Sequence, residues 1–339
     1  MPLSLSVIIP TYNRRASVER LLRSLDAQTL PPDQFEVIIV IDGSEDGTRE
    51  LVAGWKAAYR LRGIWQTNQK QAAARNNGVR ASSGDLIVFL DDDMEAVPGL
   101  LAAHQAAHAG GELLGVVGAV HMRLPPNAPP VADYWSRRFE RLAPILGQPG
   151  YCIPPGEFYV GNFSIGRQPL LAAGVFDAGT FGEYGAEDVE LAYRLERQGV
   201  RIVYSLKAIS YQHHTKDMAE LLRDRLAEGR TEVAMVSKHP ELWPATQLSE
   251  YTHASPGLRA ARSFLLTTGR LVPGFSAALA HGLAWLDGRG LAWPDRWYVL
   301  AMGYYYWLGA DQAVRANRRT GQGLTQLRSV PPAGKAGPH

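Results

Sequence analysis

Short apolar runs alternate with amphipathic segments along the first third of the chain. Apolar residues dominate positions 5–10, 35–41 and 86–90, as in short buried strands. Residues 18–25 place valine and leucine on one face of a predicted helix, and residues 46–61 predict a second helix. Strands that alternate with helices of this length predict βαβ units, in which the strands form a parallel sheet.

The pattern becomes less regular after the third apolar run. The elements expected next are helices over residues 98–109 and 187–198 and strands over residues 114–121, 160–165, 200–205 and 208–213. Residues 124–157 are rich in proline and aromatic residues and predict a long loop with a helix near residues 133–141.

We therefore predict an α/β fold with a Rossmann-like, mostly parallel sheet flanked by helices and followed by a helical C-terminal region. The α/β domain is expected over residues 1–215, with halves of about residues 1–121 and 122–215. Helical spacing continues over residues 216–320, and the glycine- and proline-rich residues 321–339 are expected to be a disordered tail.

The composition is that of a globular protein, with 46% hydrophobic and 20% charged residues among 339. A net charge of +2 gives no basis for a nucleic-acid partner. The single cysteine, Cys152, excludes an internal disulfide framework and suits a reducing compartment. We see neither a signal peptide nor a run of about 18 apolar residues, so we expect a cytoplasmic protein.

Three aspartates follow the third apolar run directly. Asp91, Asp92 and Asp93 come at the carboxyl end of a predicted strand, where open α/β sheets bind ligands. Adjacent like charges at such a place need neutralisation, and carboxylate oxygens suit Mg²⁺ or Mn²⁺. The alternative is an exposed acidic turn, which the buried run before it disfavours.

Four segments in this order resemble the inverting nucleotide-sugar transferases of glycosyltransferase family 2, which have the glycosyltransferase A fold. They are Ser-Val-Ile-Ile-Pro-Thr-Tyr-Asn-Arg at 6–14, Val-Ile-Asp-Gly-Ser at 40–44, Ala-Ala-Arg-Asn at 73–76 and Phe-Leu-Asp-Asp-Asp at 89–93. The resemblance covers about residues 3–215. Ile41 and Lys70 depart from the family pattern near the expected base pocket, which leaves the nucleotide open.

The resemblance implies the following donor contacts: Pro10, Thr11, Tyr12, Asn13, Arg14, Asp42, Arg75, Asp91 and Asp92. Asp42 would accept a hydrogen bond from a base N–H group, as in uracil recognition, although Asp-Gly-Ser is also a good turn that caps a helix. Arg75 would contact the base or the diphosphate, and the alternative is a solvated helix arginine.

The resemblance also implies a metal site. Asp93 would be the main ligand of Mn²⁺ or Mg²⁺, with Asp91 on the ribose and metal-bound water and as a further candidate ligand. A histidine after the last strand would complete the shell. His213 and His214 point to opposite faces of a strand, and we prefer His214, with His213 as the alternative.

The segment from residue 184 to 190 resembles the acceptor side of this family. Asp188 matches the catalytic base, which takes the proton of the acceptor hydroxyl group. The matching acceptor contacts are Glu187, Asn162, Tyr184 and Gly185. Acids are also favoured at any helix N-terminus, so the alternative is a capping role.

The aromatic run at residues 297–308 is too short to span a membrane. It predicts packing on the α/β domain or on a second subunit in a homodimer. The alternative is a peripheral contact with the inner face of a membrane.

These features predict a metal-dependent inverting glycosyltransferase, in particular a hexosyltransferase that uses a UDP-sugar donor. The acceptor stays open among carbohydrates, lipid-linked sugars, proteins and small molecules. One alternative is a sugar nucleotidyltransferase, although residues 11–14 lack its glycine-rich basic loop. Another is a carbohydrate-binding protein that kept the fold without the chemistry. A dinucleotide oxidoreductase is disfavoured because no G-x-G-x-x-G follows the first strand.

Overall fold

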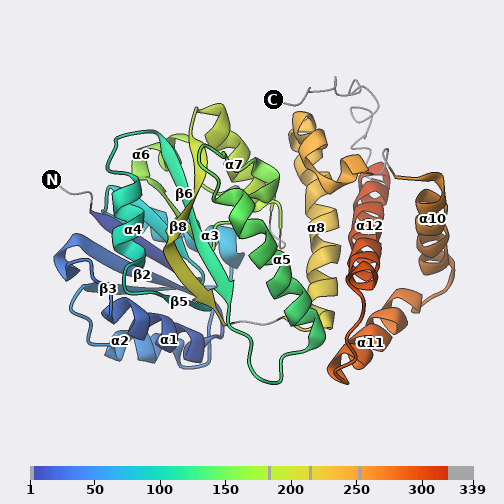
Figure 1. Cartoon of the computed structure of the whole chain (residues 1–339), viewed down its shortest axis with the longest axis horizontal. Helices are drawn as coiled ribbons and strands as arrows, with labels where there is room; N and C mark the ends of the chain where they lie inside the picture. Colours follow the sequence, from blue (N-terminus) through green and yellow to red (C-terminus); the bar gives the residue numbers. More distant parts are fainter. Residues whose placement is uncertain (1–3, 182–184, 214–215, 251–253, 320–339) are drawn as a thin grey trace. The chain divides into compact units, whose positions relative to one another are not determined.

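The computed structural model describes residues 4–181, 185–213, 216–250 and 254–319 (Figure 1). The chain divides into two compact units. Unit 1 comprises residues 1–128, 135–182 and 187–215, and unit 2 comprises residues 129–134, 183–186 and 216–339.

Unit 1 is built around a mixed sheet with strand order β3-β2-β1-β4-β7-β6-β8-β5 in the described residues. The strands are β1 Leu5–Thr11, β2 Phe35–Asp42, β3 Arg60–Gln66, β4 Leu86–Leu90, β5 Met94–Ala96, β6 Leu114–Met122, β7 Asn162–Gly166 and β8 Arg201–Gln212. Strands β1 to β4 are parallel, and β7 is antiparallel to both β4 and β6. The predicted α/β class is confirmed, and the parallel pairing dominates in its first half.

Helices cover both faces of this sheet (Figure 1). Their bounds in the first 215 residues are α1 Arg15–Asp26, α2 Thr48–Gly54, α3 Lys70–Ala81, α4 Leu100–Ala107, α5 Pro130–Leu146, α6 Arg167–Ala172 and α7 Glu187–Arg197, with the short 3-10 turns η1 Pro32–Gln34 and η2 Pro155–Glu157. Val7 and Ile9 of β1 pack with α1, α2 and α4, whereas Ile8 packs with α3, α6 and α7. Successive residues of a strand point to opposite faces, so one buried strand serves two apolar cores.

The strands expected over residues 200–205 and 208–213 form a single strand, β8, and two expected helices have other ends in the structure. The helix expected over residues 46–61 ends at Gly54, because Arg60–Gln66 pairs with β2 as the edge strand β3. The helix expected near residues 133–141 is longer and begins at Pro130, whose fixed φ suits the first turn of a helix. In both cases the local periodicity identified an element but not its ends.

Unit 2 is helical. Its elements are α8 Met218–Lys238, η3 Pro240–Ala245, η4 Gln247–Ser249, α10 Pro256–Leu271, α11 Phe275–Gly288 and α12 Asp295–Arg319. Helices α8 and α12 approach closely at Gly229 and Gly309, where an added Cβ would lie 2.0 Å from Tyr306 O and 1.9 Å from Leu226 O. Only glycine permits this approach.

The aromatic run at residues 297–308 is divided between the interior and the surface. Tyr298 and Tyr306 are buried within unit 2 itself, which is neither packing on the α/β domain nor on a second subunit, and Trp297 is 52% exposed. None of the described helices has the length and hydropathy of a membrane-spanning segment.

Candidate active site

The three aspartates lie at the end of β4, beside the end of β1. All five residues of β4 are buried, and burial continues at Asp92 and Asp93, which are 6% and 4% exposed. Thr11, the last residue of β1, donates from Oγ1 to Asp92 Oδ2 at 2.7 Å. The parallel pairing of β1 with β4 therefore brings the first motif of the sequence against the fourth.

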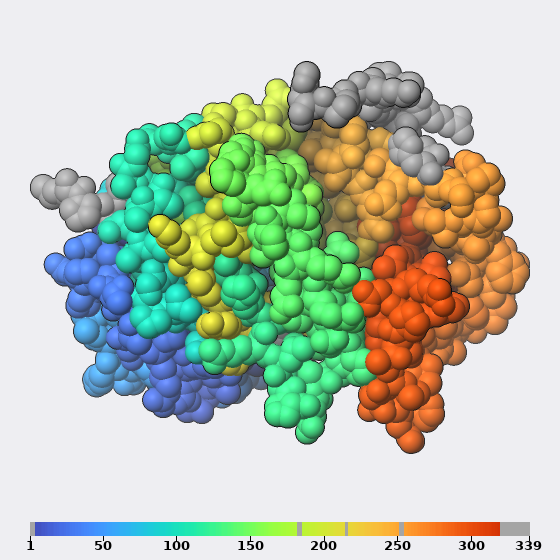
Figure 2. Space-filling model, viewed as in Figure 1, coloured from blue at the N-terminus to red at the C-terminus, as the bar shows by residue number. Residues whose placement is uncertain are grey.

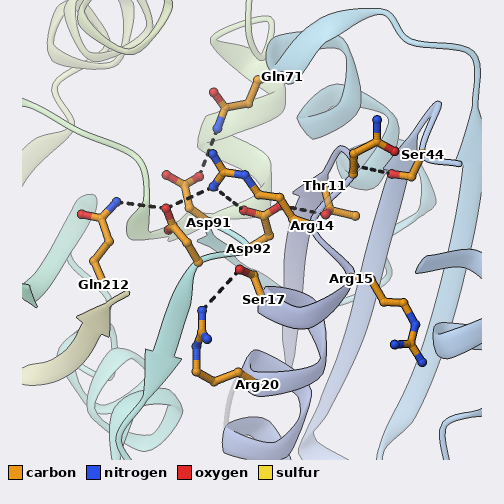
Figure 3. Close-up of polar contacts among 12 residues, drawn as sticks. Thr11, Arg14, Arg15, Ser17, Arg20, Ser44, Gln71, Asp91, Asp92 and Gln212 are labelled. Carbon is orange, nitrogen blue, oxygen red and sulfur yellow. Dashed lines mark hydrogen bonds and ion pairs between the residues drawn. The ribbon is translucent and has the colours of Figure 1, made fainter. Parts of the chain in front are cut away.

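Arg14 neutralises two of these carboxylates (Figure 3). Its Nη1 lies 3.2 Å from Asp92 Oδ1 and 3.2 Å from Asp93 Oδ2, and Gln212 Nε2 donates to Asp93 Oδ2 at 3.3 Å. Burial raises the pKa of Asp92 to about 7, although the positive charge of Arg14 opposes this shift.

The loop before α1 aims Arg14 at the aspartates. Asn13 has a left-handed φ of 51°, a conformation that asparagine tolerates better than most residues. Its backbone N–H donates to Ser44 Oγ at 2.9 Å, and its Oδ1 accepts from the Glu45 N–H at 2.9 Å. Two of the predicted donor segments are thus joined, with Pro10 buried in β1 and Tyr12 51% exposed.

Asp91 has different partners from its two neighbours. Its Oδ1 accepts from Gln71 Nε2 at 3.1 Å and from Arg75 Nη2 at 3.0 Å, and its backbone N–H donates to Gly161 O at 3.0 Å. An added Cβ at Gly161 would lie 2.6 Å from Asp91 Oδ2. Glycine at this position therefore keeps the space beside the carboxylate open.

Arg75 connects the aspartates to the predicted catalytic base. Its side chain is only 2% exposed, with Nη1 at 3.2 Å from Asp188 Oδ1 and 3.9 Å from Glu187 Oε1. The guanidinium lies over the ring of Phe176, 5.3 Å from its centroid. Arg75 is therefore an internal bridge, and the alternative of a solvated helix arginine is wrong.

Asp188 lies in the first turn of α7. Its Oδ2 accepts from the Val160 N–H at 3.2 Å, and about a quarter of its side chain, 25%, is exposed. Burial raises the pKa of Asp188, and the charge of Arg75 opposes this shift. Ala186, two residues before Asp188, has a φ of 67°, a strained conformation for a residue with a side chain. The turn thus holds the carboxylate in a fixed direction.

Asp42 fixes the start of α3. Its Oδ1 accepts from Gln66 Nε2 at 2.7 Å and from the Gln69 N–H at 2.8 Å, while Oδ2 accepts from the Lys70 N–H at 2.9 Å. Lys70 itself has a left-handed φ of 73°. The capping alternative therefore describes contacts that Asp42 makes, at α3 rather than at the helix near Asp46.

The structure corrects the prediction for Asn162. This side chain is 0% exposed, its Oδ1 lies 2.9 Å from His104 Nε2, and its Nδ2 donates to Ala208 O at 3.0 Å. Because both ends of its amide group form hydrogen bonds inside the sheet, Asn162 does not fit the role of a contact with the acceptor substrate. Gly185 has a φ of 99°, and a Cβ added there would lie 2.9 Å from Glu228 Cγ. Both the backbone conformation and the close packing therefore require glycine.

Of the two candidate histidine ligands, the structure describes only His213. His213 Nε2 lies 2.5 Å from Glu95 Oε2, and the backbone N–H of His213 donates to Asp93 O at 3.0 Å. His214 and Tyr184 lie outside the described residues.

The aspartates fit a divalent cation by chemistry but form a small donor set. Within the described residues, no three or more His, Cys, Asp or Glu side chains gather in a way that would hold a metal ion. The Asp91 and Asp93 carboxylates are the hard ligands that Mg²⁺ or Mn²⁺ prefers. Magnesium is often held by one or two carboxylates together with substrate phosphates, and Asp91 and Asp93 are the residues that would supply such carboxylates here.

Sequence reasoning missed Gln71 and Gln212. Gln71 precedes Arg75 by four residues, a spacing that places both on one helix face and would have indicated it. Gln212 follows the apolar part of β8 and carries no local signal, because only the tertiary fold brings it to Asp93.

Residues 6–167 match the model of the family described as glycosyl transferase family 2. Validoxylamine A glucosyltransferase from Streptomyces hygroscopicus subsp. limoneus is 32% identical over 272 residues, which cover 71% of this chain and 58% of that protein. The chain thus spans somewhat more than half the length of this curated relative.

Solved structures share the fold at low sequence identity. The mannosyltransferase PcManGT from Pyrobaculum calidifontis, solved with GDP-Man and Mn²⁺, has a TM-score of 0.59 at 22% identity, covering 92% of this chain and 87% of that chain. S. aureus TarS 1–349, solved with UDP-GlcNAc, has a TM-score of 0.52 at 15% identity, covering 94% and 92%. The predicted glycosyltransferase A fold is confirmed by this likeness.

Proposed function

This chain belongs to glycosyl transferase family 2 through its residues 6–167, and from that premise we propose that it transfers a sugar from a nucleotide diphosphate donor to an acceptor hydroxyl group. The observation that carries the proposal is the bridge formed by Arg75. One guanidinium holds Asp91, at the acidic end of β4, and Asp188, at the start of α7. A donor site and a proton acceptor are thereby fixed at a constant separation.

The proposed donor site lies along Thr11, Arg14 and the aspartates. Asp93 and Asp91 would hold Mn²⁺ or Mg²⁺, which when bound neutralises charge on the leaving nucleotide diphosphate. Arg14, which contacts Asp92 and Asp93, would also bind the diphosphate of the donor. The PcManGT complex with GDP-Man and Mn²⁺ supports this assignment by analogy.

Asp188 is the proposed general base. Its carboxylate accepts the proton from the acceptor hydroxyl group as that oxygen attacks the anomeric carbon from the face opposite the leaving group. Val160 N–H and Arg75 hold its two oxygens in place, so little reorientation is needed for attack. The transfer proceeds with inversion and requires no covalent enzyme intermediate. We propose Glu187, in the same turn, as an acceptor contact.

We propose UDP as the nucleotide of the donor. The related structures carry both UDP-GlcNAc and GDP-Man, so the base has to be tested directly. Tyr12, which is half exposed beside the Asn13–Ser44 contact, is the aromatic side chain best placed to stack on a base.

The decisive experiment measures donor binding by calorimetry with UDP-glucose, UDP-GlcNAc and GDP-mannose, each with Mn²⁺ and with a chelator. We expect binding of a UDP-sugar in Mn²⁺, its loss with chelator, and its loss in Asp93→Asn. Release of free sugar or transfer to an acceptor panel, including validoxylamine A, then tests the reaction. No binding of any nucleotide sugar in the presence of metal would overturn the proposal.

A further inference from the structure

Helix α10 of unit 2 packs through one side only. Arg270 Nε donates to Asp311 Oδ2 of α12 at 3.2 Å, and an added Cβ at Gly269 would lie 2.6 Å from Tyr304 Oη. These contacts fix the side of α10 that faces α12. No residue of α10 is buried, so the rest of the helix adds little to the interior of unit 2.

The outer side of α10 is apolar. Phe264 is 70% exposed and Leu271 is 76% exposed, and they lie seven residues apart, two turns along one face. Ala260 and Ala261 are exposed one turn before Phe264 on the same face. A helix that turns phenylalanine and leucine outward and arginine toward its neighbour leaves its apolar face uncovered by the part of the chain that the structure describes.

Helix α11 and the first turns of α12 continue this pattern. They form the orange and red part of the chain in Figures 1 and 2. The large apolar side chains at least 49% exposed from the end of α10 onward are Leu271, Val272, Trp285, Leu291, Trp297, Val299 and Leu300. Single exposed apolar residues are common, but such a concentration in one helical region marks an interaction surface.

The charge of the same region is positive. Residues 255–300 contain five arginines and two aspartates, with no lysine or glutamate. Asp287 is only 2% exposed and accepts from the Val131 N–H, so it adds little to the surface. Arg289 lies over the ring of Trp285, 4.8 Å from its centroid, which places a cation directly beside an exposed aromatic side chain.

We propose that this surface, defined by Phe264, Leu271, Trp285 and Trp297 with Arg289 and Arg296, docks on an anionic membrane. Helices that combine leucine, phenylalanine and tryptophan with arginine lie in the membrane interface, where tryptophan is favoured. The arginines meet the anionic lipid headgroups, and the apolar side chains enter the boundary with the acyl chains. A two-fold dimer would instead set this positively charged patch against an identical patch, so the two copies would repel each other.

The test is flotation of the full chain with vesicles of phosphatidylcholine alone or mixed with phosphatidylglycerol. We expect binding to the anionic vesicles that weakens as salt is raised. The double variant Phe264→Ser with Leu271→Ser should bind them at least about tenfold less tightly. The double variant Arg289→Glu with Arg296→Glu should lose the preference for anionic lipid.

Leu113→Ser is the matched control, because Leu113 is 44% exposed in unit 1 and should leave binding unchanged. Thermal melting checks that every variant is folded, and the charge variant supplies a second readout if the serine variant is not. Equal binding of the serine variant and the wild type, or no binding to anionic vesicles, overturns the proposal. So does a dimer in light scattering that the serine variant converts to a monomer.

Discussion

Asp91 and Asp188, which are distant in the sequence, both contact the guanidinium group of Arg75. Arg75 Nη2 lies 3.0 Å from Asp91 Oδ1, and Arg75 Nη1 lies 3.2 Å from Asp188 Oδ1. A planar guanidinium that bridges two carboxylates through separate nitrogens fixes both direction and distance better than a lysine ammonium can. The position of the proposed base is therefore set by the same residue that holds one end of the acidic segment.

Replacing Arg75 with an uncharged residue should destabilise unit 1. We expect Arg75→Met to lower the free energy of unfolding by about 3 kcal/mol, because Asp91, Glu187 and Asp188 lose their shared partner. Urea unfolding measures the change. Arg80→Met, at an exposed position on the same helix, should shift the midpoint little. Equal effects of the two substitutions would show that the bridge contributes nothing.

The proposed base predicts a selective loss of turnover. Asp188→Asn keeps the size of the side chain and should lower kcat by about 100-fold or more with donor binding retained. Glu196→Gln, at an exposed position of α7, is the matched control and should keep full activity. Unchanged turnover in Asp188→Asn would show that another group acts as the base.

The pH profile should carry the signature of this carboxylate. Burial raises the pKa of Asp188, and a general base must be ionised to act. The acid limb of kcat/KM should therefore lie above the usual aspartate pKa of about 3.9, with activity rising as pH rises through the raised pKa. If the acid limb of kcat/KM lies at the usual aspartate pKa, a group other than Asp188 is responsible for it.

Gly161 predicts a steric test of the donor site. Gly161→Ala places a methyl group 2.6 Å from Asp91 Oδ2, so the carboxylate must move. We expect weaker donor and Mn²⁺ binding in calorimetry, with little change in thermal stability. Gly99→Ala is the control, since nothing lies within 4 Å of an added Cβ there. Wild-type affinities in Gly161→Ala would argue against Asp91 as a contact.

Unit 2 should lose stability as pH rises. Burial raises the pKa of Glu232 from 4.5 to about 7, although the hydrogen bond from Tyr306 opposes this shift. The folded state therefore holds a proton that the unfolded chain releases, so this contribution is present below pH 4.5 and is lost as pH rises to about 7.

Glutamine at position 232 should remove this dependence. At pH 8 we expect Glu232→Gln to be more stable than the wild type, by up to about 3 kcal/mol at 1.4 kcal/mol per unit. Urea unfolding at pH 5 and pH 8 measures both proteins. A wild type whose stability does not fall between these pH values would contradict the assignment.

The sequence by itself determined the strands of the first half and the acidic segment. A buried strand such as β4 is a local apolar run, and its end is visible where the aspartates begin. The order of strand and helix then indicated the α/β class, because βαβ connections bring the strand ends to one edge. Asp91, Asp92 and Asp93 could be named for this reason, whereas Asp188 is identified by the resemblance of residues 184–190 to the acceptor segment of the family.

Tertiary structure alone decided which of the candidate side chains face one another. Arg75 and Asp188 are 113 residues apart, and no local pattern shows that an arginine on an alanine-rich helix lies buried beneath Phe176. Asn162 follows the same logic, because its place in a strand of the sheet interior, and not its chemistry, removes it from the site. Long-range packing selects among polar residues that periodicity treats alike, since hydrogen bonds and burial depend on the partner that the fold supplies.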